Sequence, residues 1–303
     1  MPELKVYLLG APHLDLNGRP VEIDRHKALA LLAYLAVEGG SHTREALATM
    51  FWPDYDASRA YAYLRRTLWT LKDALGEGWL HADREKVEVR RAQNFWLDVE
   101  QFRACLKKCG EHGHPPSEAC PECIPQLSQA ADLYRADFLS GFSLRDSQAF
   151  DDWQFFQAES LRGELASALQ RLVVAYTAGG EHEQAVINAR RWLAIDPLDE
   201  EAQRALMLAY ANSGQRNAAM RQYQESQSIL EAELGVAPQP ETTALYEQIR
   251  LGKMDPVRMP LPGRRGKLSG PPITYRLRLR HLSGVRRSWL RFPACSGSLA
   301  AAC

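Results

Sequence analysis

Long apolar runs are missing from this chain of 303 residues. No stretch reaches the roughly 18 apolar residues that a membrane-spanning helix needs, which excludes a helical membrane protein. The first ten residues, MPELKVYLLG, lack the basic start, long apolar core and small-residue cleavage site of a secretory signal peptide. We therefore expect a cytoplasmic protein with no membrane partner, in a compartment where disulfides are rare.

Catalytic motifs are missing as well. The sequence has no HExxH metal-binding motif. The closest approach to a phosphate-binding loop surrounds Gly266-Lys267, but Leu268 stands where that loop needs Ser or Thr, and Leu261 where it needs its first glycine. These absences predict that the protein is not an enzyme and, in particular, not an ATPase.

The chain also has no net charge, but its basic and acidic residues are distributed unevenly over three segments. Residues 1–97 carry 13 basic and 13 acidic side chains, residues 98–250 carry 13 and 23, and residues 251–303 carry 11 and 1. The last segment is rich in Pro, Gly and Ser and has no helical period, which predicts a basic, disordered tail. The first two segments are expected to be folded domains.

The first segment has the pattern of a small sheet followed by three helices. Three short apolar-rich stretches, LKVYLLG, HLDLNG and PVEI, surround the hairpin-turn dipeptide Asn17-Gly18. A buried helix is predicted from about His26 to Val37, and a short helix after the N-cap residue Thr43. A long helix is predicted over residues 57–75, where Asp56 is the N-cap and Gly76 the stop.

The long helix and the hairpin that follows carry the candidate DNA contacts. Tyr61, Leu64, Leu68, Leu71 and Leu75 recur every three or four residues and predict a buried stripe. The opposite face suits the major groove, and a wing formed by residues 79–82 and 87–89 places basic residues, Arg91 among them, near phosphates. The predicted DNA-binding residues are Arg59, Tyr63, Arg66, Thr67, Thr70, Arg84, Lys86 and Arg90. The alternative is a solvated helix face beside an ordinary hairpin.

Residues 165–250 contain an internal repeat of 34 residues. Leu172 recurs as Leu206, Ala175-Tyr176 as Ala209-Tyr210, Gly180 as Gly214, Ala185 as Ala219 and Ile195 as Ile229. This period is typical of tetratricopeptide-type helix pairs. An aromatic series precedes it and is interpreted as packing between helices: Tyr134, Phe138, Phe142, Phe150, Trp153, Phe155 and Phe156.

Both folded segments resemble parts of one family. The stretches GAPHLDLNGRPV, HKALALLAYLAV and LRRTLWTLKDALG resemble the response-regulator-type winged helix of the SARP-like regulators, the antibiotic regulatory protein family. The run LYRADFLSGF, followed by FDDW and paired helices, resembles the bacterial transcriptional activator domain that follows the winged helix in that family. The resemblance implies DNA binding by the first segment and protein contacts by the second.

A Cys/His-rich insert at residues 105–123, CLKKCGEHGHPPSEACPEC, stands apart from this pattern. The pair Cys120 and Cys123 has the spacing of one half of a tetrahedral zinc site. Cys105, Cys109, His112 and His114 can supply the remaining ligands, so four of these six residues are candidates for a structural zinc site. The alternative is a loop with incidental cysteines.

Together these features predict a mainly α protein. An N-terminal winged helix-turn-helix (α+β) occupies residues 1–97, and an all-α tetratricopeptide-like helical repeat domain occupies residues 98–250. The expected function is a DNA-binding transcription regulator of the activator type. Its expected partners are double-stranded DNA and RNA polymerase or another protein, with a homodimer as a further candidate. The alternatives are a protein-interaction scaffold and a detached N-terminal part of a larger signal-transduction ATPase regulator.

Overall fold

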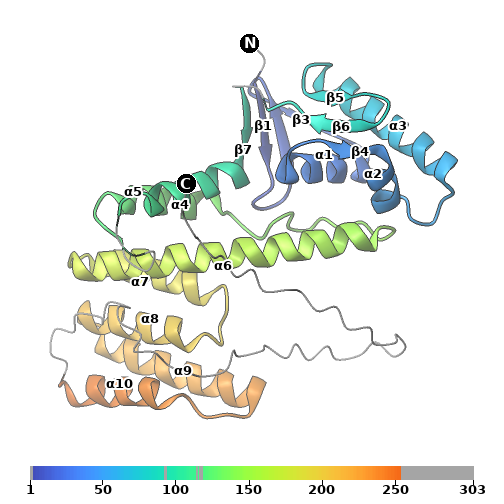
Figure 1. The fold of residues 1–303 in the computed structure, drawn as a ribbon. Helices are drawn as coiled ribbons and strands as arrows, with labels where there is room; N and C mark the ends of the chain where they lie inside the picture. Colours follow the sequence, from blue (N-terminus) through green and yellow to red (C-terminus); the bar gives the residue numbers. More distant parts are fainter. Residues whose placement is uncertain (1–2, 92–93, 114, 116–118, 254–303) are drawn as a thin grey trace, which may run out of the picture. The chain divides into compact units, whose positions relative to one another are not determined.

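The computed structural model describes residues 3–91, 94–113, 115 and 119–253. The predicted tail lies almost wholly outside the described residues, as does His114 of the insert. Within the described ranges the chain is mainly helical, as predicted, and the strands are confined to its N-terminal part (Figure 1). None of the helices described is long and apolar enough to cross a membrane.

A four-stranded sheet opens the fold. Strands β1 (Leu4–Tyr7), β2 (His13–Leu16) and β3 (Arg19–Val21) pair antiparallel, and β7 (Phe95–Leu97) lies parallel to β1, in the order β3-β2-β1-β7. The predicted turn joins β2 to β3, with Asn17 and Gly18 at φ values of 57° and 76°. Such positive values are those that Asn and Gly tolerate best. The partner strand β7 was not predicted, because parallel pairing across some 90 residues leaves no local pattern.

Three helices and a second sheet complete the N-terminal module. Helices α1 (His26–Glu38), α2 (Arg44–Phe51) and α3 (Ala57–Leu75) have nearly the predicted bounds. The predicted wing is an antiparallel pair of β5 (Leu80–Ala82) and β6 (Lys86–Val89). A third short strand, β4 (His42–Thr43), pairs with β6 and was not predicted.

The second part of the chain is all helical. Helices α4 (Asp98–Gly110) and α5 (Cys123–Leu133) precede the long α6 (Gln148–Ala178). After α6 come α7 (His182–Leu193), α8 (Glu200–Asn212), α9 (Arg216–Leu234) and α10 (Pro240–Leu251), stacked as hairpins below α6 (Figure 1). This is the tetratricopeptide-like arrangement that the 34-residue period predicted.

The repeat is visible in individual hydrogen bonds. At the turn after α6, the amide of Glu181 donates to Tyr176 O at 2.8 Å. Thirty-four residues later the amide of Gln215 donates to Tyr210 O, also at 2.8 Å. Gly180 and Gly214 both have φ of 76°, so the two turns share one conformation that favours glycine.

The two parts of the chain pack tightly against each other. Trp153 of α6 donates from Nε1 to Glu38 Oε1 of α1 at 2.7 Å, and its ring lies 5.1 Å from that of Tyr34. Ser147 Oγ donates to Met50 O of α2 at 2.7 Å. All described residues accordingly belong to one compact unit.

The aromatic series divides into two groups. Tyr134, Phe138, Phe142 and Phe150 are buried and Trp153 packs against the core, as predicted. The prediction is wrong for Phe155 and Phe156, which are 57% and 69% exposed. Both side chains are therefore left largely at the surface of α6.

Candidate nucleic-acid interface

Local signals build the helix-turn-helix formed by α2 and α3. Thr43 accepts a hydrogen bond from Ala46 N at 3.2 Å, and Asp56 accepts one from Arg59 N at 3.1 Å, so both predicted N-caps are confirmed. Leu64, Leu68, Leu71 and Leu75 are buried, whereas Tyr61 is half-buried. One side of α3 is therefore packed in the core, and the opposite side faces solvent.

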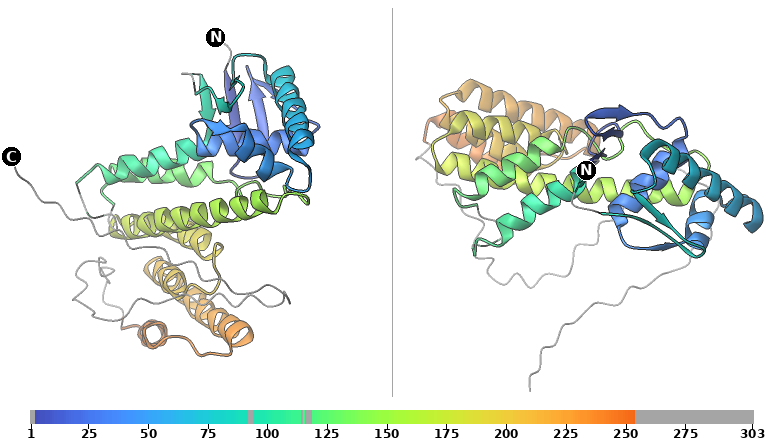
Figure 2. Two further views of the ribbon diagram at one scale, coloured as in Figure 1. Left: turned by 45° about the vertical axis from the view of Figure 1, so that its right-hand side comes forward. Right: turned by 90° about the horizontal axis from the view of Figure 1, so that it is seen from above.

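The outward side of α3 carries most of the residues predicted to read DNA. Arg59, Tyr63 and Arg66 are exposed, and Thr70 is half-buried with its hydroxyl donating to Arg66 O at 3.1 Å. The Arg59 side chain lies 3.4 Å from Asp56 and is 74% exposed, so this weak ion pair leaves it available. Figure 2 shows α3 at the edge of the N-terminal module, away from the stacked hairpins.

Thr67 does not belong to this surface. Its side chain is only 4% exposed, because it lies at the margin of the buried stripe between Leu64 and Leu68. A helix turns by 100° per residue, so a residue directly after an exposed one can already face the core. This burial argues against a direct contact between the Thr67 side chain and DNA, although Thr67 lines a groove beside Arg66.

Sequence reasoning missed Arg65, which lies on the flank of α3 that faces the wing. Together with Tyr61 and Arg44 it lines a groove of about 860 Å³ whose other wall is the wing turn, residues 82–85. Arg65 is exposed. The helical period that identifies Arg66 also places Arg65 outside the buried stripe, so the sequence pattern is sufficient to find this residue.

The wing turn is held by one carboxylate. Asp83 Oδ1 accepts hydrogen bonds from the amides of Lys86 and Glu85, both at 2.7 Å, and Arg44 Nε donates to Asp83 O at 2.7 Å. The bonds from Lys86 and Glu85 hold the pKa of Asp83 below its ordinary value. This order in the turn leaves Arg84 and Lys86 exposed at the tip.

The two arginines at the end of the wing differ in role. Arg90 is exposed and its Nη2 lies 3.3 Å from His81 Nδ1 across the hairpin. Arg91, in contrast, donates to Ala36 O of α1 and lies 3.8 Å from Glu100. Arg91 therefore ties the module together, and the expectation that it lies ready for phosphate is wrong.

A second groove, of about 740 Å³, runs along the other flank of α3. Its basic lining residues are Arg25, His26, Lys27, Arg66 and Arg145. The only acidic lining residue, Asp146, lies 2.7 Å from Lys27 Nζ. Although the N-terminal module has no net charge, basic side chains thus gather beside α3, and Arg145 comes from the second part of the chain.

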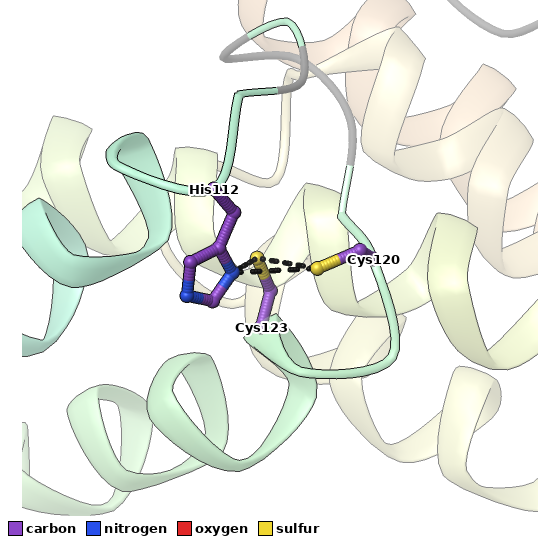
Figure 3. Close-up of side chains that lie close together, drawn as sticks. All are labelled: His112, Cys120 and Cys123. Carbon is purple, nitrogen blue, oxygen red and sulfur yellow. Dashed lines mark hydrogen bonds between the residues drawn. The ribbon is translucent and has the colours of Figure 1, made fainter.

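The candidate metal ligands separate into two sets. His112, Cys120 and Cys123 have ligand atoms that all lie within 4.8 Å of one another (Figure 3). Cys105 and Cys109 are buried in the core and are not members of this described group. His114 lies outside the described residues.

The ionisation of the two neighbouring thiols is unequal. Burial opposes ionisation of Cys120, but hydrogen bonds with His112 and Cys123 outweigh it and lower the pKa of this thiol to about 6. Burial raises the pKa of the Cys123 thiol to about 11. Without a cation, the pair therefore holds a single negative charge near neutral pH.

Comparison with known proteins gives relatives along most of the chain. Regulatory protein AfsR of Streptomyces coelicolor is 26% identical over 251 residues, which cover 81% of this chain and 24% of AfsR. Transcriptional regulatory protein MoaR1 of Mycobacterium tuberculosis is 26% identical over 251 residues, covering 80% of this chain and 78% of MoaR1. The chain thus spans about a quarter of the length of AfsR but most of MoaR1. These names are those of regulators, in agreement with the expectation of a non-enzymatic protein.

A solved structure shares the fold. It is that of Mycobacterium tuberculosis EmbR in complex with a low affinity phosphopeptide, with a TM-score of 0.62 and 22% identity over 84% of this chain and 67% of EmbR. The family model of the bacterial transcriptional activator domain matches residues 97–250, which is half of the chain and begins at the last residue of β7. The resemblance expected for the second segment is thereby confirmed, and the protein belongs to the bacterial transcriptional activator domain family.

Proposed function

We propose that this protein is a cytoplasmic transcription regulator of the activator type that binds promoter DNA through α3 and the wing. The observation that carries the proposal is the gathering of exposed basic side chains along one helix whose opposite side is buried. Arg59 and Arg66 face outward, and Arg65 lies beside the wing. Arginine is the side chain best suited to the acceptor pair of guanine in the major groove.

The proposed interface has two kinds of contact. Arg59, Tyr63, Arg65, Arg66 and Thr70 meet base edges or the walls of the major groove, while Arg84, Lys86 and Arg90 meet the phosphate backbone next to it. In the groove beside Arg66, Arg25 and Arg145 extend the phosphate-binding surface. The sequence of the operator is then read by α3, and the wing supplies affinity that depends on salt.

The helical hairpins are proposed to contact a protein partner. Residues 98–250 carry ten more acidic than basic side chains, and this surplus repels DNA while attracting a basic protein surface. RNA polymerase fits an activator best, and a second copy of the chain fits operators with repeated half-sites. The names of the relatives support a role in regulation: AfsR is named a regulatory protein and MoaR1 a transcriptional regulatory protein.

The experiment begins with selection of bound sequences from a random DNA pool by the full chain. On the selected site, Arg66→Ala should weaken binding about 5- to 150-fold, which corresponds to the loss of about 1–3 kcal/mol for a bidentate contact. Arg221→Ala, at an exposed position of α9, is the matched control and should leave affinity unchanged. Mobility shift or fluorescence anisotropy at several salt concentrations measures both.

Two results distinguish this proposal from the alternatives. Arg84→Ala should weaken binding to all sequences alike and lower the slope of log K against log salt by about one, as expected for one phosphate contact. If the folded Arg59→Ala/Arg66→Ala double variant bound the selected site as tightly as the unaltered chain, the assignment to α3 would be wrong. No salt-dependent DNA binding at all would favour the interaction scaffold.

A further inference from the structure

The Cys/His-rich insert brings three side chains together at one end of the helical domain. His112 follows the end of α4, Cys120 precedes α5, and Cys123 is the first residue of α5 (Figure 3). His112 Nδ1 lies 3.3 Å from Cys120 Sγ and 3.2 Å from Cys123 Sγ, and the two sulfur atoms are 3.5 Å apart. The four cysteines in the described residues are not joined in disulfides.

These three distances fit the edges of a zinc coordination tetrahedron. With Zn–S near 2.3 Å and Zn–N near 2.0–2.1 Å, tetrahedral geometry sets ligand sulfurs about 3.8 Å apart and nitrogen about 3.5 Å from sulfur. The observed edges are shorter than these values by about 0.2–0.3 Å, a difference that small rotations of two of the side chains supply. One histidine and two cysteines in this spacing are ligands that zinc prefers.

Exposure distinguishes His112 and Cys120 from the core cysteines, whereas Cys123 is as fully buried as Cys109. Cys109 is fully buried and its thiol donates to Cys123 O at 3.8 Å, and Cys105 is packed among apolar residues of the core. His112 is exposed and Cys120 half-buried, so an ion can reach the cluster from solvent. Arg171 of α6, itself 8% exposed, places Nη2 4.0 Å from Cys123 Sγ.

We propose that His112 Nδ1, Cys120 Sγ and Cys123 Sγ bind a structural zinc ion that ties the end of α4 to the start of α5. Both sulfur atoms bind as thiolates, and a thiol that still carries its proton releases it to solvent on binding, so the ion and two thiolates form a neutral centre with the neutral imidazole. A water molecule or one further side chain completes the tetrahedron. The site does not depend on the proposed DNA-binding function, because it lies in the helical domain.

A zinc ion at this position would stabilise the connection between α4 and α5. The segment between α4 and α5 is short and rich in Pro and Gly, so it has little apolar surface with which to fold. A metal ion orders such a segment by joining its two ends. It also fixes the first residue of α5, which Cys109 and Arg171 contact from α4 and α6.

The test uses the untagged full chain, purified under reducing conditions without chelator. Elemental analysis should find about one zinc per chain. Titration of metal-free protein with Co²⁺ should give the intense visible bands of a tetrahedral site and a near-ultraviolet charge-transfer band for two thiolates. Each of the variants Cys120→Ser and Cys123→Ser should halve the charge-transfer intensity and lower the zinc content, and His112→Ala should lower zinc content with both thiolates retained.

Controls keep the result interpretable. Cys105→Ala tests a core cysteine of the same insert, and the double variant Cys295→Ser/Cys303→Ser removes the two cysteines of the tail. Both should keep the zinc content and cobalt spectrum of the unaltered chain. Zinc absent from the unaltered protein after reconstitution, an octahedral cobalt spectrum, or equal loss of zinc in the control and ligand variants would each overturn the proposal. So would a Cys120–Cys123 disulfide that persists in reductant.

Discussion

Asp98 is the residue that joins the sheet to the helical domain. It is fully buried at the start of α4, and its Oδ2 accepts hydrogen bonds at 2.8 Å from the amides of both Leu8 and Leu9. Its Oδ1 accepts from Val99 N at 2.8 Å. A single carboxylate thus satisfies three buried backbone donors, and the cost of a replacement depends on how many of them it leaves without an acceptor.

Two substitutions separate the hydrogen bonds of Asp98 from its charge. Asp98→Ala should lower the free energy of unfolding by about 3 kcal/mol or more, because it leaves three buried donors unsatisfied and each of them costs about 1–3 kcal/mol. Asp98→Asn keeps an acceptor oxygen for Leu8 and Leu9 but turns an amide group toward Val99 N, so it should cost about 1–3 kcal/mol, less than Asp98→Ala. Urea unfolding of the three proteins measures this, and an equal loss in both variants would contradict it.

The stability difference between the unaltered chain and Asp98→Asn should depend on pH, and the shifted pKa of Asp98 gives the sign of that dependence. Burial raises the pKa of Asp98 above its ordinary value of 3.8, against the amides of Leu9, Leu8 and Val99, which lower it. The folded state therefore holds this proton more tightly than the unfolded state. Its contribution to stability is present at low pH and is lost as pH rises from 3.8 through the raised pKa. Asp98→Asn should lack that decline.

The side of a helix on which a residue lies could be predicted for some positions and not for others. Periodicity assigned Arg66 and Leu68 to opposite sides of α3, and both assignments are confirmed. The expectation differs from the structure at three positions: Thr67 is buried, and Phe155 and Phe156, whose aromatic character predicts packing between helices, are exposed. There the exposure depends on which neighbouring element packs closest, and that information is not local.

At the scale of elements, helices with their own capping residues were predicted almost residue by residue. α2 and α3 begin after Thr43 and Asp56 because those side chains satisfy the first free amides of each helix. Strands β4 and β7 were missed because each exists only through a partner far away in sequence. Pairing of this kind is decided by the packed fold, since a two- or three-residue strand has almost no pattern of its own.

The turns of the repeat allow a test at this scale. Gly180 has φ of +76°, so Gly180→Ala should cost about 1 kcal/mol although no atom lies within 4 Å of the added carbon. Gly163, inside α6, has equally open space and a helical backbone, and Gly163→Ala should stabilise by about 0.5–1 kcal/mol. Thermal unfolding of both variants checks the opposite signs. Stabilisation by Gly180→Ala would show that the turn is not held in the left-handed conformation.

At the scale of the whole molecule, the winged helix and the helical domain are not independent parts. Phe51 of α2 lies 5.5 Å from Phe150 of α6, and Lys27 of α1 pairs with Asp146. The sequence predicted two domains with different partners, but the packing between them came from residues dispersed along the chain. Removing residues 98–250 would expose Phe51 and leave the amides of Leu8 and Leu9 without Asp98. Point variants in the full chain therefore separate the two roles better than a deletion does.

The shared interface predicts one cooperative unfolding transition. Trp153 packs on Tyr34, Phe138 and Phe150 with ring centres 5.1, 5.6 and 5.3 Å away, so it links α1 to the helical domain. Trp153→Ala should lower the free energy of unfolding by about 3 kcal/mol. Phe156→Ala on the same helix removes a side chain that is 69% exposed and should change it by less than about 0.5 kcal/mol.

Calorimetry and two local probes decide whether the unit is single. If the interface couples both parts, Trp153→Ala shifts the loss of helix content and the loss of DNA binding to the same lower temperature, within one heat-absorption peak. Trp153→Phe, which keeps a ring but loses the hydrogen bond to Glu38, should fall between the two other variants, since one such bond contributes about 1 kcal/mol. Two separate peaks, of which Trp153→Ala moves only one, would mean that the winged helix folds and binds DNA independently of the helical domain.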